Sequence, residues 1–74
     1  MRITVKLFAS LRSGRFERQA FDYPEGSVVG DVVRSAGIPG EEATIILVNN
    51  VHAAMERRLA EGDTVAIFPL VGGG

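Results

Sequence analysis

The strongest constraint on the fold is one stretch of helical spacing that lies between segments of strand-like alternation. The apolar residues Val29, Val32, Val33 and Ala36 form one stripe, which predicts a helix of about ten residues with a single apolar face. Gly30 and the valines are poor helix formers, so packing rather than intrinsic propensity must hold this helix. A lone helix has to bury its stripe against another layer, and a sheet is the layer that this sequence offers.

The ends of the predicted helix carry residues that commonly begin and end helices. Ser27 follows the breaker Pro24-Glu25-Gly26 and stands where an N-cap residue is expected. Gly37 suits the left-handed position after a helix, Ile38 can make the apolar contact beyond it, and Pro39 prevents continuation. The helix is therefore expected to lie between these two groups of residues.

Two segments before the helix predict a hairpin of strands. Residues Arg2–Ser10 alternate with period two, and Ser13-Gly14 supplies a turn into Arg15–Tyr23. The first segment places Ile3, Val5 and Leu7 on one face and Thr4, Lys6 and Phe8 on the other. The second is mixed, with Phe21 and Tyr23 on one face and Phe16 and Ala20 on the other. Mixed alternation suits an edge strand better than a central one.

Three short segments after the helix also predict strands. Ile45–Val48 is rich in β-branched residues, and Asn49-Asn50 tolerates positive φ, so a tight turn into Val51–Ala53 is expected. The turn Glu61-Gly62-Asp63 leads into Thr64–Pro69, where Val65 and Ile67 alternate with Ala66 and Phe68. The stretch between residues 55 and 60 is expected to be irregular.

The order strand, strand, helix, strand, short strand, strand predicts an α+β protein with the β-grasp, or ubiquitin-like, arrangement. A mixed sheet of four to five strands would pack on the one helix. The first and last strands would lie side by side at the centre, parallel to each other because the chain between them makes a full crossover.

Composition excludes most classes of site. The 74 residues contain no cysteine and one histidine, which excludes thiolate metal sites, disulfides and a cysteine nucleophile, so no metal site is predicted. The net charge of −1 argues against nucleic-acid binding. No apolar stretch is long enough to cross a membrane. We expect a cytoplasmic domain with no membrane association and no stably bound cofactor.

The polar residues suggest no catalytic group. A serine, His52 and an aspartate could be combined on paper, but nothing orients them. His52 is interpreted either as a surface histidine on a short edge strand or as part of a partner-binding surface. Arg12, Arg15 and Arg18 lie around the first hairpin, where they would be solvated or would steer an acidic partner.

The C-terminal residues carry the clearest chemical signal. After a domain predicted to span residues 1–69, the sequence continues Leu70-Val71-Gly72-Gly73-Gly74. Fully extended, this flexible tail would reach roughly 17 Å, and its three glycines could thread a channel that any Cβ would block. Its α-carboxylate would be ionised and could attack the α-phosphate of ATP on another enzyme. The resulting acyl-adenylate would react with a sulfur or nitrogen nucleophile.

Three motifs resemble the MoaD/ThiS family of ubiquitin-like sulfur carriers over the whole chain. Residues 6–12, Lys-Leu-Phe-Ala-Ser-Leu-Arg, are similar to the end of the family's first strand. Residues 59–66 resemble its Glu-Gly-Asp turn into the last strand, and residues 68–74 its Phe-Pro-Pro-Val-x-Gly-Gly terminus. Leu70 replaces the second proline of that terminus, and Asn50 replaces a frequent glycine.

The resemblance implies a sulfur-transfer cycle that other proteins drive. A ubiquitin-activating-type enzyme would use ATP to adenylate Gly74, and a sulfur donor enzyme would convert it to a thiocarboxylate. The motifs favour the molybdopterin branch, where the chain would be the non-catalytic small subunit of molybdopterin synthase beside its large subunit. In the thiamine branch the partner would be a thiazole synthase.

A partner-binding surface follows from the strand alternation. If Val5 and Ile67 face the helix, Phe8 and Phe68 lie on the opposite side of two neighbouring central strands. Leu47 and His52 are expected to join them, and the resemblance implies docking through this side. The predicted partner-binding residues are Phe8, Leu47, His52, Phe68, Pro69, Leu70 and Val71.

Three functions therefore remain open. The chain could carry sulfur for a small-molecule cofactor, or it could be a ubiquitin-like modifier whose carboxylate ends on a lysine amine. It could also be an interaction module with an inert tail. Only the first predicts an isolable thiocarboxylate and a low-molecular-weight acceptor.

Overall fold

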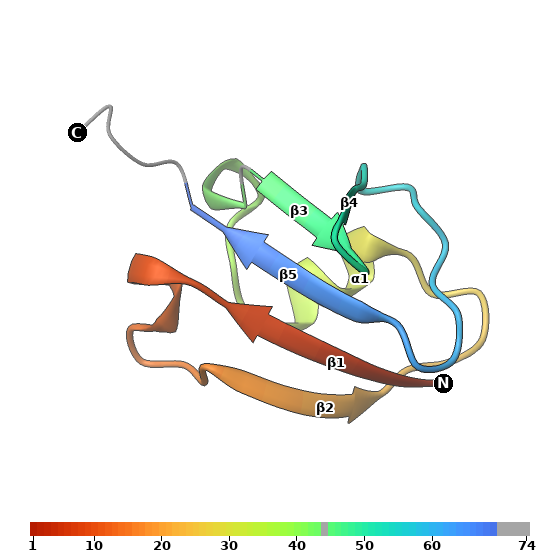
Figure 1. Cartoon of the computed structure of the whole chain (residues 1–74). Helices are drawn as coiled ribbons and strands as arrows, with labels where there is room; N and C mark the ends of the chain where they lie inside the picture. Colours follow the sequence, from red (N-terminus) through yellow and green to blue (C-terminus); the bar gives the residue numbers. More distant parts are fainter. Residues whose placement is uncertain (44, 70–74) are drawn as a thin grey trace.

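In the computed structural model, helix α1 (Val29–Ser35) packs across one face of a mixed sheet (Figure 1). The structure describes residues 1–43 and 45–69. The predicted tail, residues 70–74 with its glycines Gly72, Gly73 and Gly74, lies outside this range. The described strands are β1 (Arg2–Leu7), β2 (Arg18–Asp22), β3 (Ile45–Val48), β4 (Val51–His52) and β5 (Thr64–Phe68). Two short 3-10 helices, η1 (Ala9–Arg12) and η2 (Gly40–Glu42), complete the elements.

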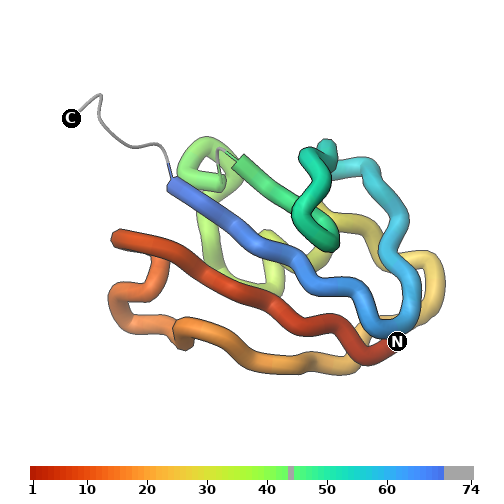
Figure 2. Tube along the Cα trace, viewed as in Figure 1, coloured from red at the N-terminus to blue at the C-terminus, as the bar shows by residue number. Residues whose placement is uncertain are grey.

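The strands follow the order β2-β1-β5-β3-β4 across the sheet. β1 and β5 are parallel and central, and the remaining neighbours are antiparallel. Figure 2 shows the first and last strands running side by side although they are far apart in the sequence. The predicted β-grasp fold, with its parallel central pair and β2 at an edge, is confirmed.

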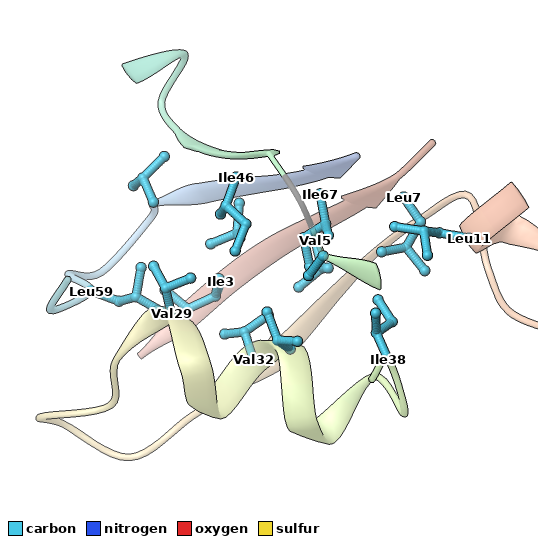
Figure 3. Close-up of a cluster of buried hydrophobic side chains, with 14 residues drawn as sticks. Ile3, Val5, Leu7, Leu11, Val29, Val32, Ile38, Ile46, Leu59 and Ile67 are labelled. Carbon is cyan, nitrogen blue, oxygen red and sulfur yellow. The ribbon is translucent and has the colours of Figure 1, made fainter. Parts of the chain in front are cut away.

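The core lies between the sheet and α1 (Figure 3). Alternation turns Ile3, Val5 and Leu7 of β1 and Val65 and Ile67 of β5 inward, and all five are fully buried. The helical stripe meets them from the other side. The core is completed by Leu11, Val29, Val32, Val33, Ile38, Ala43, Ile46, Val48 and Leu59. Burial of apolar surface at about 25 cal/mol per Å² thus holds a helix whose own propensity is weak.

The first strand is shorter than predicted. It ends at Leu7 instead of Ser10, and the chain then forms η1, which the alternation did not predict. Ala9 has φ +53°, a left-handed conformation that ends the extended backbone. The turn carries Leu11 into the core, where it is 1% exposed. Burial of this leucine is the physical reason for the early end of β1.

The second strand also differs from the prediction. It spans Arg18–Asp22 rather than Arg15–Tyr23, and Phe16 does not lie on the face opposite Phe21. The two rings contact each other at a centroid distance of 5.2 Å, and both pack against the core. The prediction was wrong because alternation holds only in extended backbone, and Phe16 lies before the strand begins.

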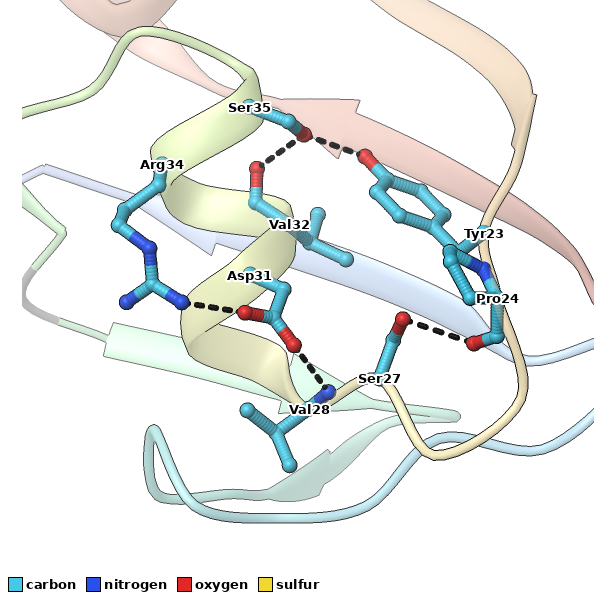
Figure 4. Close-up of polar contacts among 8 residues, drawn as sticks. All are labelled: Tyr23, Pro24, Ser27, Val28, Asp31, Val32, Arg34 and Ser35. Atoms are coloured by element: carbon cyan, nitrogen blue, oxygen red, sulfur yellow. Dashed lines mark hydrogen bonds and ion pairs between the residues drawn. The ribbon is translucent and has the colours of Figure 1, made fainter.

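Ser27 is not the N-cap of the helix, and the helix has seven residues rather than about ten. Val28 occupies the N-cap position, and its N–H donates to Asp31 Oδ2 at 2.9 Å (Figure 4). The Ser27 hydroxyl instead donates to the Pro24 carbonyl at 2.8 Å. The predicted end is confirmed, since Gly37 has φ +73° and the Ile38 N–H donates to the Val33 carbonyl.

The turn between β3 and β4 forms as predicted, with Asn49 at φ +52° and Asn50 at φ +69°. Positive φ at both positions is the geometry of a type I′ hairpin turn. β4 ends at His52 rather than Ala53, and β5 ends at Phe68 rather than Pro69. Residues 55–60 belong to no helix or strand, as expected.

Asp63 ties this turn to the start of β5. Its nearly buried carboxylate accepts hydrogen bonds from Asn49 Nδ2 at 2.9 Å and from the Ala60 N–H at 2.8 Å. The Asn49 side-chain oxygen in turn accepts from the Thr64 N–H at 3.0 Å. The β3–β4 turn and the segment from Ala60 to Thr64 thus share one polar network.

We expect Asp63→Ala to lower the free energy of unfolding by about 2–3 kcal/mol, because two donors lose a charged acceptor in a nearly buried site. Urea denaturation followed by circular dichroism measures the change. Glu56→Ala, which removes an exposed carboxylate from the preceding loop, should stay within about 0.5 kcal/mol. Equal effects of the two variants would show that the network contributes nothing.

Candidate functional site

The face of the sheet that turns away from α1 carries the predicted aromatic pair. Phe8 and Phe68 lie with ring centroids 4.2 Å apart and an interplanar angle of 10°, so the rings are stacked. Phe8 follows β1, and its N–H donates to the Ile67 carbonyl at 3.2 Å, which holds it beside β5. We call the surface formed by Phe8, Leu47, Ala66 and Phe68 the outer face.

The outer face is hollowed rather than flat. An open hollow of about 290 Å³ is lined by Lys6, Phe8, Leu47, Asn49, Asn50, Thr64, Ala66 and Phe68. The apolar side chains of the lining are half-buried, as are Lys6 and Thr64, whereas Asn49 and Asn50 are exposed. No helix or loop among the described residues covers it, so a shape-complementary apolar group of a partner could enter.

The structure brings together three of the predicted partner-binding residues and places a fourth, His52, on the same face of the sheet. Phe8, Leu47 and Phe68 share the hollow. His52 pairs with Leu47 in the β3–β4 register, so it lies on the same face, exposed on the edge strand beside the lining of the hollow. Pro69 is buried in the free chain, and its role in partner binding stays a prediction. Leu70 and Val71, like Gly72, Gly73 and Gly74, lie outside the described residues.

Arg12, which was expected to be solvated or to steer an acidic partner, also adjoins this surface, although it was not among the predicted partner-binding residues. Its Nε donates to the Leu7 carbonyl at 2.9 Å, and its guanidinium carbon lies 5.6 Å from the centroid of the Phe8 ring. This distance falls within the range of a cation–π contact. Arg12 therefore places a cation beside the aromatic pair. In the sequence, the only indication of this role was that Arg12 is the last residue of the motif at residues 6–12.

Arg15, a second arginine of this region, stabilises the fold. Arg15 reaches from the turn after η1 to the end of α1, where its Nη2 donates to the Gly37 carbonyl at 2.7 Å and its Nε to the Ala36 carbonyl at 3.2 Å. A cation at a helix C-terminus also compensates the helix dipole. Arg15 thus clamps the first hairpin to the helix.

Residues 1–43 and 45–69 contain no group of three histidine, cysteine, aspartate or glutamate side chains that could hold a metal ion. No helix within these ranges is long and apolar enough to span a membrane.

Comparison with known proteins finds one family model and several solved structures that are similar to this chain. The model of the ThiS family matches residues 5–74. SAMP1 from Haloferax volcanii is 25% identical, with a TM-score of 0.79 and full coverage of both chains. A protein from Pyrococcus furiosus assigned as molybdopterin converting factor subunit 1 is 26% identical, with a TM-score of 0.78 over 96% of this chain and 99% of that one.

One further solved structure shows only that the fold is shared, and the curated protein sequences give no match. The complex of subunits 1 and 2 of molybdopterin-converting factor from Helicobacter pylori contains a chain that is 18% identical, with a TM-score of 0.67 and full coverage of both chains. At this identity the likeness supports a common fold. No curated protein sequence matches this chain.

Proposed function

Because this chain belongs to the ThiS family of ubiquitin-like sulfur carriers, we propose that it carries sulfur as a thiocarboxylate on Gly74, for molybdopterin synthesis. The observation that carries the proposal is the stacked Phe8–Phe68 pair on the outer face. The pair lies at the carboxyl end of central strand β5, directly before the residues that lead to Gly74. A docking surface and a reactive terminus would thus adjoin each other.

The chemistry requires no catalytic group on this chain. An adenylating enzyme would join the Gly74 carboxylate to the α-phosphate of ATP, releasing pyrophosphate. The outer sulfur of a donor enzyme's persulfide would then displace AMP and form an acyl disulfide with Gly74. A second thiol would cleave that S–S bond, which would release the Gly74 thiocarboxylate and leave a disulfide on the donor. Ordering the five residues 70–74 in a partner channel would cost on the order of 5–10 kcal/mol of backbone entropy. Contacts on the outer face would offset this cost.

Two lines favour the molybdopterin branch, in which the chain would be the small subunit of molybdopterin synthase. One is the Phe-Pro-x-Val motif at residues 68–71. The other is the likeness to the Pyrococcus furiosus subunit 1. The synthase large subunit would receive the tail and supply the catalytic residues. A protein of the same fold occurs in complex with subunit 2 in the Helicobacter pylori structure.

A protein modifier is the second candidate, because SAMP1 is as similar to this chain as the subunit 1 protein. A second solved structure from Haloferax volcanii, 25% identical, is described as small archaeal modifier protein 1. In that role the same activated carboxylate would form an amide with a lysine of another protein. The name of the matching family model, ThiS, keeps thiazole synthesis as the alternative for the sulfur acceptor.

Intact-mass spectrometry tests the proposal. The chain is incubated with an adenylating enzyme and a sulfur donor enzyme from the same organism, with ATP and cysteine. We expect the mass gain that accompanies exchange of one carboxylate oxygen for sulfur, and its loss when Gly74 is deleted. Conjugates of higher mass without a thiocarboxylate would favour the modifier, and an unchanged mass would contradict both functions.

Replacing either stacked ring is expected to weaken partner binding. Phe8→Ala or Phe68→Ala removes a large apolar contact from the outer face, so the Kd for the synthase large subunit should rise at least about tenfold. Isothermal titration calorimetry measures the affinity. Val51→Ala is the matched control, because Val51 is 65% exposed and lies opposite buried Val48, off the outer face. Wild-type affinity in both phenylalanine variants would exclude docking through this surface.

A further inference from the structure

The outer face has its positive charge on one side. Lys6 lines the hollow, and Arg18 lies opposite it in the β1–β2 register. Arg12 lies over the ring of Phe8. The far rim is formed by the neutral side chains of Asn49 and Asn50. None of the residues that line the hollow is acidic, so an apolar centre is bordered by cations on the side of β1 and β2.

Arg12 is oriented before any partner arrives. The bond from its Nε to the Leu7 carbonyl and the contact with the Phe8 ring fix the guanidinium plane at two places. The side chain is still 45% exposed. Within the described residues, its Nη2 has no hydrogen-bond partner. A fixed guanidinium loses less entropy when it forms further hydrogen bonds.

The carboxylate already near Arg12 holds it weakly. Glu17 Oε2 lies 3.6 Å from Arg12 Nη1, and the Glu17 side chain is 74% exposed. An exposed ion pair at this distance contributes little free energy. A better placed carboxylate can therefore replace Glu17 at small cost.

Resting on the proposed function, we infer that Arg12 is a specificity-determining contact that pairs with a carboxylate on the protein partner. The partner surface that fits is an apolar patch against the Phe8–Phe68 stack, with an aspartate or glutamate beside it on the Phe8 side. A carboxylate matches the two-pronged geometry of a guanidinium. The adjoining apolar hollow favours a folded protein over a free anion. The apolar contacts would supply affinity, and the charge pair would set register and association rate.

Charge reversal at Arg12 tests the inference. The probe is the subunit 2 protein, the synthase large subunit, from the same organism, and its binding to the full chain is measured between low and high salt. Arg12→Glu should raise Kd at least about tenfold and flatten the salt dependence of the association rate. Arg12→Lys keeps the charge and loses the fork, so it should show a smaller loss.

Arg57→Glu provides the matched control. Arg57 is exposed in the loop that contacts the start of α1, where its carbonyl accepts from the Val29 N–H at 2.9 Å. The substitution Arg57→Glu changes the net charge by the same amount as Arg12→Glu, but at a position away from the outer face. Its Kd should stay within about threefold of the wild-type value, as expected for a charge outside the interface.

A charge swap then identifies the partner group. Each acidic residue near the binding surface of the probe is changed to lysine, and one of these changes should restore most of the affinity of Arg12→Glu. Thermal unfolding verifies that the variants fold. Arg12→Gln serves if the reversal destabilises the chain, and it should still lose at least about fivefold in affinity.

The outcomes separate this inference from the function on which it rests. If Arg12→Glu and Arg12→Gln bind like Arg57→Glu while Phe8→Ala binds weakly, the outer face docks the partner without a carboxylate, and the inference is overturned. If the wild-type chain forms the thiocarboxylate but no lysine change restores Arg12→Glu, the inference also falls. If the thiocarboxylate never forms, the proposed function fails first.

Discussion

Adding one tryptophan after Gly74 is expected to abolish thiocarboxylate formation, with activity falling below the detection limit. The added residue removes the Gly74 carboxylate, which would be the reacting group. It also places a large side chain where the proposed channel would admit only glycine. Intact-mass spectrometry after incubation with the adenylating enzyme, the sulfur donor and ATP measures the product.

The control places the same bulky residue elsewhere. Glu41→Trp changes an exposed side chain in η2 and should react as fast as the wild-type chain. Normal thiocarboxylate formation by the extended chain would mean that the terminus is not the reagent. The whole functional proposal would then have to be abandoned.

Ile67→Ala is expected to cause the largest loss of stability among these predictions, about 2–5 kcal/mol. Ile67 is fully buried on β5, next to Leu7 of β1 and Ile46 of β3 in the two registers. The truncation would leave a cavity at the centre of the sheet. A domain of this size has a total stability of roughly 4–11 kcal/mol, so a large part of it would be lost. Urea denaturation measures the difference.

Ile45→Ala is the matched control for that substitution. It removes the same atoms from the adjoining strand β3, but Ile45 is 39% exposed. Its loss should therefore be about 1 kcal/mol or less, because most of the transfer free energy is absent at an exposed position. Similar losses in the two variants would mean that the core is not centred on β1 and β5.

The aromatic stack shows which part of the site strand alternation could predict and which part it could not. Once Val5, Leu7, Val65 and Ile67 face the helix, Phe8 and Phe68 must point the other way, and this was predictable from period two alone. Alternation could not predict that the rings stack at 4.2 Å. That distance depends on the parallel register of β1 and β5, which is set by the whole sheet.

Prediction of the site from the sequence could not give the position of the Arg12 side chain. The contact of Arg12 with Phe8 exists because η1 folds the chain back after Leu7. The turn itself depends on burial of Leu11 by residues distant in the sequence. Phe68 is half-buried on the outer face, whereas the next residue, Pro69, is buried. Neighbours in the chain need not share an environment.

Features decided by one residue and its immediate neighbours were determined by the sequence itself. Asn49-Asn50 adopts positive φ and Gly37 ends the helix because these backbone preferences are local. The tertiary structure alone decided the end of β1, the position of Phe16 and the orientation of Arg12. Each of these depends on which distant side chains remain to be buried or paired once the sheet has closed on α1, and no local pattern contains that information.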